Sequence, residues 1–187
     1  MPNHVLNRLI IKADKNKTQE VFHFMTGKTL QDGTCQYIDF NKIIPIPVEV
    51  TVNEIIINNK KYYDYSNCNE WCRNNWGSKW NAFKQKLETL NILWFTTADI
   101  GVPFIIEKLS RIFPDIEFEY TFADEHWGCT TGDGIFRNGE TDITFPTNGS
   151  DKAYEIYFKV NPGMKNYFLF TEEGYEWIGQ TLSTGML

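Results

Sequence analysis

The sequence predicts an α+β fold in which helices cover one face of an antiparallel sheet. Two segments support this prediction. Residues 92–97 read as a strand, Pro103 opens an amphipathic helix, and residues 116–122 alternate apolar and polar side chains as a second strand does. Residues 5–12 form an earlier apolar run, and a helix follows it. Two such units can share one antiparallel sheet with their helices on the same face.

The first unit begins with the strand over residues 5–12. Asn16 and Gln19 then have the spacing of a helix capping box, and Gly27 suits the end of that helix. A second strand is expected over residues 36–40. The apolar residues that share one face of the helix are Val21, Phe22 and Met25.

Residues 45–91 read as an insertion between the two units. Residues 68–75 predict a short helix that Gly77 ends. A second helix is expected after Ser78, because the next apolar residues are spaced by three, four and three and so share one helical stripe. These residues are Trp80, Phe83, Leu87 and Leu90.

The C-terminal part predicts hairpins. Asn138-Gly139 between two apolar runs is typical of a type I′ turn. Residues 154–160 alternate again and read as a strand, and residues 167–170 can pair back onto it. Because no internal repeat is visible, we expect one domain over residues 1–187. Its architecture is ferredoxin-like α+β, with an inserted helical segment and C-terminal hairpin strands.

Composition and charge exclude several classes of protein. Of 187 residues, 42% are hydrophobic and 16% aromatic, which indicates a dense core and not disorder. The net charge of −6 disfavours strong non-specific binding to nucleic acid, which needs a basic surface. No apolar run approaches the roughly 20 residues that span a bilayer, and the N-terminus lacks the pattern of a signal peptide. We therefore expect a cytoplasmic protein with reduced cysteines and no membrane partner.

Several motifs, in order along the chain, resemble those of one family. Over roughly residues 1–140 they resemble the YubB or DUF1281-type family, which is carried on phages, plasmids and related mobile elements. Ordered multiple matches arise by chance less often than a single motif does. The motifs are Pro2-Asn3-His4-Val5 with Asn7 and Leu9, residues 39–47, residues 75–81, Phe95-Thr96-Thr97-Ala98, residues 109–115, and Glu125 with Gly128.

The resemblance implies a ferredoxin-like domain but no reaction and no iron–sulfur cluster, because a fold does not specify a function. The family usually has a tryptophan and prolines after the Thr-Ala pair, whereas this chain has Asp99-Ile100-Gly101-Val102-Pro103. A groove built there is expected to differ from that of the family. No cofactor is expected.

The segment over residues 74–81 holds two tryptophans and is the first candidate for contact with a partner. Aromatic rings can stack on a base, sugar or peptide, and nearby polar side chains can add hydrogen bonds. The competing interpretation is structural, since Trp80 begins the apolar stripe and is expected in the core. The residues left as surface candidates are Trp76, Lys79, Asn75 and Asn81.

An acidic run with a histidine, Asp124-Glu125-His126, is the candidate for general acid–base catalysis. Two carboxylates and an imidazole can move protons if one of them is desolvated. Neighbouring residues of a strand point in different directions, however, and the alternative is a solvated strand end or a carboxylate that holds the glycine-containing turn. No second half of an active site is visible.

The four cysteines raise the possibility of a zinc site. Cys68 and Cys72 would share a helical face, and His126 and Cys129 lie three residues apart in a turn. Together they would supply tetrahedral nitrogen and sulfur ligands. The spacing is not that of a zinc ribbon, so we favour free reduced thiols and expect no metal.

The leading functional hypothesis is a non-enzymatic binding or regulatory module of a mobile element. Its partner would be a protein or nucleic-acid-associated macromolecule of the host or of the element. The alternative is a small enzyme whose acid–base site lies near Asp124, Glu125 and His126.

Overall fold

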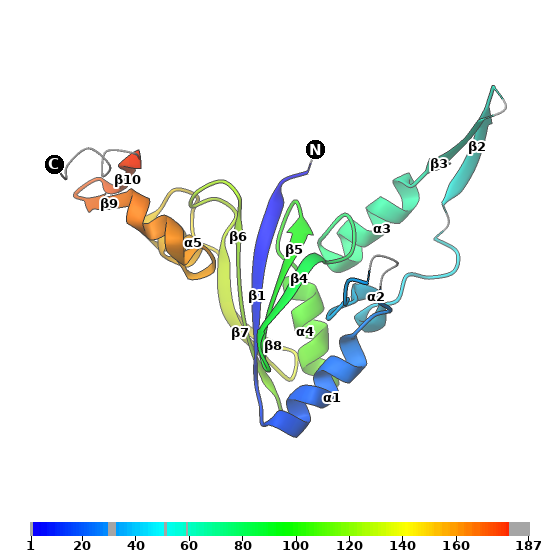
Figure 1. Ribbon diagram of the computed structural model, residues 1–187, viewed down its shortest axis with the longest axis horizontal. Coiled ribbons are helices and arrows are strands. Elements are labelled where there is room, and N and C mark those ends of the chain that lie inside the picture. The colour runs from blue at the N-terminus through cyan, green and yellow to red at the C-terminus, as the bar shows by residue number, and fades with distance from the viewer. Residues whose placement is uncertain (1, 30–32, 51, 59, 180–187) are drawn as a thin grey trace.

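The computed structural model describes residues 2–29, 33–50, 52–58 and 60–179 (Figure 1). Within these residues, no helix combines the length and apolar character that crossing a membrane requires. The elements in chain order are β1 (His4–Lys12), α1 (Lys15–Met25), α2 (Phe40–Ile43), β2 (Asn53–Ile57), β3 (Lys60–Asp64), α3 (Ser66–Trp76), β4 (Phe83–Thr89), β5 (Ile92–Ala98), α4 (Pro103–Ile112), β6 (Glu117–Asp124), β7 (Gly132–Arg137), β8 (Glu140–Thr144), α5 (Asp151–Val160), the 3₁₀ helix η1 (Pro162–Tyr167), β9 (Phe168–Thr171) and β10 (Gly174–Trp177).

A six-stranded antiparallel sheet in the order β4-β5-β1-β6-β7-β8 organises the fold. Four of its strands, β1, β4, β5 and β6, alternate with α1 and α4 in the βαββαβ connectivity of a ferredoxin-like fold. The predicted fold class is therefore confirmed. Strands β7 and β8 extend the sheet beyond β6, and the hairpins β2–β3 and β9–β10 lie outside it.

Helices α1 and α4 cover one face of the sheet because each has an apolar stripe (Figure 1). In α4, Ile105, Ile106 and Leu109 are fully buried, at the spacing of one helical face. Val5 and Leu9 of β1 lie in the same core. The strand–helix–strand prediction around Pro103 is confirmed, including the proline at the helix start.

A buried polar network lies within this apolar core. Asn7 is fully buried, and its side-chain nitrogen donates to Thr97 Oγ1 at 3.0 Å and to two strand carbonyls. The Tyr120 hydroxyl donates to Asn7 Oδ1 at 2.5 Å and accepts from the Val102 backbone N–H at 2.7 Å. The network therefore ties the start of α4 to the centre of the sheet.

The strand predicted over residues 154–160 is wrong, because these residues belong to α5. Ser150 caps the helix by accepting a hydrogen bond from the Ala153 N–H at 3.3 Å. The helix packs on the second face of the sheet, against Leu6 and Ala123. The apolar residues of this segment fit the period of two of a strand as well as an apolar stripe on one face of a helix. The Ser150 cap favours the helix. The stripe is Ala153, Ile156, Tyr157 and Val160.

The helix predicted after Ser78 is also wrong, because residues 83–89 form the edge strand β4. Half-buried and exposed residues alternate along its first five positions, as in a strand with one wet face. Ser78 does not cap a helix. It is buried, donates to the Trp80 carbonyl at 2.9 Å and accepts from the Ala98 N–H at 3.2 Å.

The strand predicted over residues 36–40 is wrong as well. This segment is tied to the end of α1 by single backbone bonds, from Gly27 N–H to the Gln36 carbonyl and from Asp39 N–H to the Met25 carbonyl. Phe40 then starts α2, whose first turn Asp39 caps by accepting from the Asn41 N–H. Within the described residues, the strand that pairs with β5 at the edge of the sheet is β4.

The hairpin predicted at Asn138-Gly139 is confirmed. These two residues join β7 to β8 with φ angles of 50° and 78°, as a type I′ turn requires. Residues 168–171 form β9 but pair with β10, not with residues 154–160. The helix predicted to end at Gly77 is also confirmed, because Gly77 has a φ of 81° after α3.

Candidate functional site

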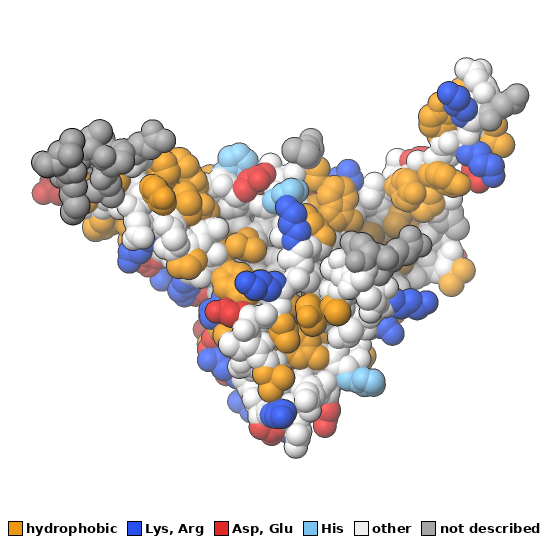
Figure 2. Space-filling model, viewed as in Figure 1, with side chains coloured by type: hydrophobic (Ala, Val, Ile, Leu, Met, Phe, Trp, Pro, Cys, Tyr) orange, Lys and Arg blue, Asp and Glu red, His pale blue; other side chains and the backbone are white. Residues whose placement is uncertain are grey.

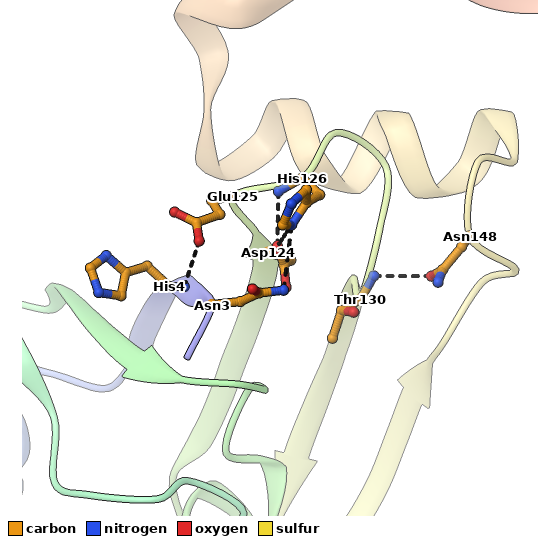
Figure 3. A network of polar contacts seen from close by, with 7 residues as sticks. All are labelled: Asn3, His4, Asp124, Glu125, His126, Thr130 and Asn148. Atoms are coloured by element: carbon orange, nitrogen blue, oxygen red, sulfur yellow. Dashed lines mark hydrogen bonds and ion pairs between the residues drawn. The ribbon is translucent and has the colours of Figure 1, made fainter. Parts of the chain in front are cut away.

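The C-terminal end of β6 lies beside the start of β1 and gathers the polar groups of the candidate site (Figure 3). Asp124 is buried, with 2% of its surface exposed. One oxygen, Oδ1, lies 2.8 Å from the His126 backbone nitrogen and 2.7 Å from His126 Nδ1. The other, Oδ2, accepts from Asn3 Nδ2 at 3.0 Å. The buried carboxylate is thus satisfied on both oxygens.

His126 contrasts with its partner in exposure. Its side chain is 63% exposed, whereas that of Asp124 is 2% exposed. With Nδ1 directed at the carboxylate, Nε2 is the nitrogen left for solvent or a ligand. A buried carboxylate that orients an exposed imidazole is the arrangement used for general acid–base chemistry. It is equally the arrangement that fixes a turn, because the Asp124 contact to the His126 backbone closes an Asx-type turn.

Glu125 points away from this pair. Its Oε1 accepts a hydrogen bond from the His4 backbone N–H at 3.2 Å, and Figure 3 shows it on the opposite side of the strand end from His126. Beside it is a small cleft of about 180 Å³, lined also by Lys84 and Asn161. The candidate acid–base run therefore divides in its contacts. Asp124 contacts His126 and Glu125 contacts the His4 backbone, while both carboxylates line the cleft and His126 does not.

The turn that follows does not add a reactive partner to His126. The Cys129 backbone N–H donates to the His126 carbonyl at 3.1 Å, which closes the turn. Farther on, the Thr130 N–H donates to Asn148 Oδ1 at 3.0 Å (Figure 3). These contacts hold the loop between β6 and β7. They supply backbone support to the site and no nucleophile.

The two tryptophans of residues 74–81 have the reverse of their predicted positions. Trp76 was expected at the surface but is 3% exposed, and its Nε1–H donates to the Ile44 carbonyl at 2.8 Å. Trp80 was expected in the core but is 38% exposed. The reversal follows from the local structure: Trp76 ends α3 on its buried side, and no helix follows Ser78 to carry a stripe.

The other candidates of this segment divide between support and surface. Asn75 donates to the Trp71 carbonyl at 2.8 Å within α3. Asn81 accepts from the Phe40 N–H at 3.0 Å and donates to Asp39 Oδ1 at 2.7 Å, so it ties α2 to the start of β4. Lys79 is half-buried, with its ammonium 5.2 Å from the centre of the Trp80 ring. Lys79 and Trp80 are therefore the pair left for contact with a partner.

Ring contacts connect this pair to the end of β6. The Trp80 ring lies 6.5 Å from that of Phe83, and the Phe83 ring lies 5.3 Å from that of His4. The His4 backbone in turn contacts Glu125. The surface candidate of the tryptophan segment and the acidic run thus lie along one continuous edge of the molecule.

The cysteines do not come together as the alternative interpretation of a zinc site would require. Cys68 and Cys72 lie on one face of α3, and burial raises the pKa of the Cys72 thiol to about 12, with a further contribution from Cys68. All four cysteines are free. No group of three or more His, Cys, Asp or Glu side chains is placed to hold a metal within the described residues. The set Cys68, Cys72, His126 and Cys129 is therefore not assembled.

Sequence reasoning missed one charged residue on the open face of the sheet. Arg8 of β1 lies with its guanidinium carbon 5.6 Å from the centre of the Trp94 ring of β5. It lines a groove of about 580 Å³. A signal was present, because Arg8 is the single basic residue within the apolar run 5–11.

Comparison with known proteins supports the fold. Residues 75–160 match the family model described as the ferredoxin-like domain in Api92-like protein. This range runs from the end of α3 to the end of α5 and contains β4, β5, α4 and β6. None of the curated proteins matches the chain.

One solved structure resembles this one, that of protein api92 from Yersinia pseudotuberculosis. The identity is 13%, and the TM-score is 0.37. The alignment covers 63% of this chain and 43% of that protein, so this chain matches less than half of its length.

Proposed function

We propose that this protein is a non-enzymatic binding module and that the β2–β3 hairpin inserts into a cleft of a protein partner. Residues 53–58 and 60–64 are called the arm here. Figure 1 shows the arm projecting away from the sheet and its helices. Every residue of β2 is exposed, and β3 is exposed up to a half-buried Asp64. This projecting, apolar hairpin is the single observation that carries the proposal.

The arm carries large apolar side chains that the rest of the described chain does not cover. Figure 2 shows hydrophobic side chains gathered on it, with cationic side chains among them. A two-stranded hairpin alone is at best marginally stable in water, so a partner that covers it adds stability. Exposed contiguous apolar surface also marks interaction sites. The exposed residues are Ile55, Ile56, Ile57, Tyr62 and Tyr63, which are 44–65% exposed.

The pairing register shows that both faces of the arm carry apolar side chains. Ile55 pairs with Tyr62, which puts these two side chains on one face. Ile56 pairs with Lys61, and Tyr63 pairs with Glu54, on the other face. A partner that covered one face alone would leave the other in water. A cleft that encloses the arm from both sides fits this pattern best.

Charge favours a protein partner over nucleic acid. Within the arm, Lys60 and Lys61 are balanced by Glu54 and Asp64, and Lys61 forms an ion pair with Glu54 at 2.9 Å. Binding to phosphates requires an excess of cations. The whole chain has a net charge of −6. The partner is thus a protein, and the motif resemblance supports a target in the host or in the mobile element.

Site-specific photo-crosslinking tests this proposal. A photoreactive phenylalanine analogue replaces Tyr62 or Tyr63, one on each face of the arm, and Phe104 on α4 serves as the control because it is 60% exposed. Both arm positions are expected to trap the same protein from a lysate of the host. Ile56→Lys is expected to abolish trapping at both positions while the melting temperature stays unchanged.

Three outcomes of this experiment contradict the proposal. They are trapping of a different protein at each face, equal trapping of the same protein at Phe104, and adducts formed with nucleic acid. Adducts between two copies of this chain would assign the arm to self-association instead.

A second candidate function is favoured by the contact between Asp124 and His126. A buried carboxylate 2.7 Å from an exposed imidazole supports general base catalysis with Nε2 as the base. Hydrolysis of a panel of ester and phosphate substrates tests it. A rate that His126→Asn and Asp124→Asn both lower, and that His4→Gln retains, supports the enzyme. A wild-type rate no higher than that of the His126→Asn variant would exclude this enzymatic function.

A further inference from the structure

The open face of the sheet carries a continuous row of side chains across all six strands. Strand pairing places the members side by side: each residue in the row is the register partner of the next. This face is the one that α5 partly covers, since Leu6 and Ala123 point to it. The row is Lys86, Trp94, Arg8, Thr121, Asp133 and Thr144.

Arg8 is held in place within this row but has no counter-charge. Its guanidinium stacks over Trp94 at 5.6 Å, and Trp94 is anchored by its Nε1–H, which donates to Glu88 Oε2 at 2.6 Å. Among the described residues, Arg8 forms no ion pair. Glu119, which also lines the groove, is paired with Lys12 at 2.8 Å. A stacked guanidinium keeps its planar edge free for a carboxylate or phosphate.

The neighbouring carboxylate in the row is already neutralised. Asp133 forms an ion pair with Lys159 of α5 at 2.5 Å and accepts from Thr121 Oγ1 at 2.7 Å. The pair also forms one wall of the groove, because both residues line it. The middle of the groove therefore carries little net charge.

Asp142 of β8 lies at the opposite end of the groove from Arg8. It lines the same cavity of about 580 Å³. Within the part of the chain that the structure describes, its carboxylate has no hydrogen-bond or ion-pair partner. Between β1 and β8 there are three strand spacings, about 14 Å in all, at about 4.8 Å each. The groove thus has an unpaired cation at one end and an unpaired anion at the other.

We propose that this groove binds a short peptide-like zwitterion, with its carboxylate on Arg8 and its ammonium group on Asp142. Three extended residues span about 10 Å, and the long Arg8 side chain shortens the remaining gap. Between the ends, Ile135 is 41% exposed and offers an apolar floor. A phosphate dianion fits less well, because Glu119, Asp133 and Asp142 all line the groove. The charge pattern selects a molecule with both charges.

Nuclear magnetic resonance of the full chain, labelled with ¹⁵N, tests this site. The probe is triglycine, and the Arg8 Nε–H and Asp142 backbone signals are followed. Triglycine is expected to shift both signals saturably. N-acetyl-triglycine, which lacks the ammonium group, and triglycine amide, which lacks the carboxylate, are each expected to bind at least fivefold more weakly. Inorganic phosphate is expected to be weaker than triglycine.

Two variants separate the ends of the site. Arg8→Gln is expected to abolish the response to triglycine and to N-acetyl-triglycine. Asp142→Asn is expected to lower the affinity for triglycine to that for N-acetyl-triglycine. The affinity for N-acetyl-triglycine itself is expected to stay unchanged. Circular dichroism checks that both variants remain folded. Shifts that do not saturate, tighter binding of phosphate than of triglycine, or binding of either capped peptide as tight as that of triglycine would overturn the proposal.

Discussion

The hydroxyl of Tyr120 donates a hydrogen bond of 2.5 Å to Asn7 Oδ1, and both side chains are fully buried between the sheet and its helices. Burial raises the pKa of Tyr120, so the phenol stays protonated and able to donate. The Tyr120 hydroxyl oxygen also accepts a hydrogen bond from the Val102 N–H at 2.7 Å. The pair therefore joins β1 and β6 to the segment that starts α4.

Tyr120→Phe tests this joint. Removing the hydroxyl leaves Asn7 Oδ1 and the Val102 N–H without their partner in the core, so the variant should lose about 1–3 kcal/mol of unfolding free energy. Urea unfolding followed by circular dichroism measures the loss. Tyr62→Phe on the exposed arm is the matched control and should change stability by less than about 0.5 kcal/mol. Equal effects of the two changes would show that the buried hydroxyl contributes nothing.

The two tryptophans of residues 74–81 should differ sharply in their contribution to stability. Trp76→Ala removes a ring that is 3% exposed and its bond to the Ile44 carbonyl, and should cost about 3–5 kcal/mol. Trp80→Ala changes a ring that is 38% exposed and should cost about 1 kcal/mol or less. Thermal melts of the two variants give the comparison. A larger loss for Trp80 would contradict the observed burial.

Gly77 should resist substitution for a conformational reason. Its φ of 81° is unfavourable for a residue with a side chain, and an added Cβ would lie 3.3 Å from the Gly101 carbonyl. Gly77→Ala should therefore destabilise the protein by about 1–2 kcal/mol. Gly163→Ala is the control, because nothing lies within 4 Å of a Cβ there and its φ is not in the left-handed region. That control should be neutral or stabilising by up to about 1 kcal/mol in urea unfolding.

The buried thiol of Cys72 should make stability depend on alkaline pH. Its pKa is raised to about 12 in the folded protein, whereas an unfolded thiol has a pKa of about 8.5. The stabilisation is complete below the unfolded pKa and is lost as pH rises toward the folded value, because only the unfolded chain releases the proton. Between pH 8 and pH 10 the loss from this group should reach about 1–2 kcal/mol.

Urea unfolding of wild type and Cys72→Ala at both pH values isolates this contribution. The variant is less stable at pH 8 because it lacks the buried side chain, but the gap between the two proteins should narrow at pH 10. A constant gap would show that the thiol does not resist ionisation.

Some helices and strands could be predicted from the local sequence pattern, and others could not. The segments around α4 and β6 were predictable because Pro103 marks a helix start and the strand alternates without interruption. The turn at Asn138-Gly139 was predictable because few residues tolerate a positive φ. Residues 83–89 and 154–160 were not predictable, because the apolar residues of each segment fit the period of a helix as well as that of a strand. Only pairing with β5 and packing on the second face decide them.

The candidate site was predictable in its residues but not in their arrangement. The sequence placed Asp124, Glu125 and His126 together at a strand end, but only the structure shows that Asp124 contacts His126 and that Glu125 contacts the His4 backbone. It identified the segment with two tryptophans but reversed which ring is buried, because burial of Trp76 depends on the distant Ile44 carbonyl. The metal set required a proximity that the described residues do not show.

The sequence by itself determined the fold class, because the hydrophobic periods and the turn residues act locally. Tertiary structure decided what local patterns do not contain: which face a strand turns to solvent, and which charges remain unpaired. Arg8 is one basic residue in an apolar run until β5 places Trp94 beside it and β6, β7 and β8 place Asp142 across the groove. The arm likewise is a candidate binding surface only because the remainder of the described chain leaves both of its faces exposed.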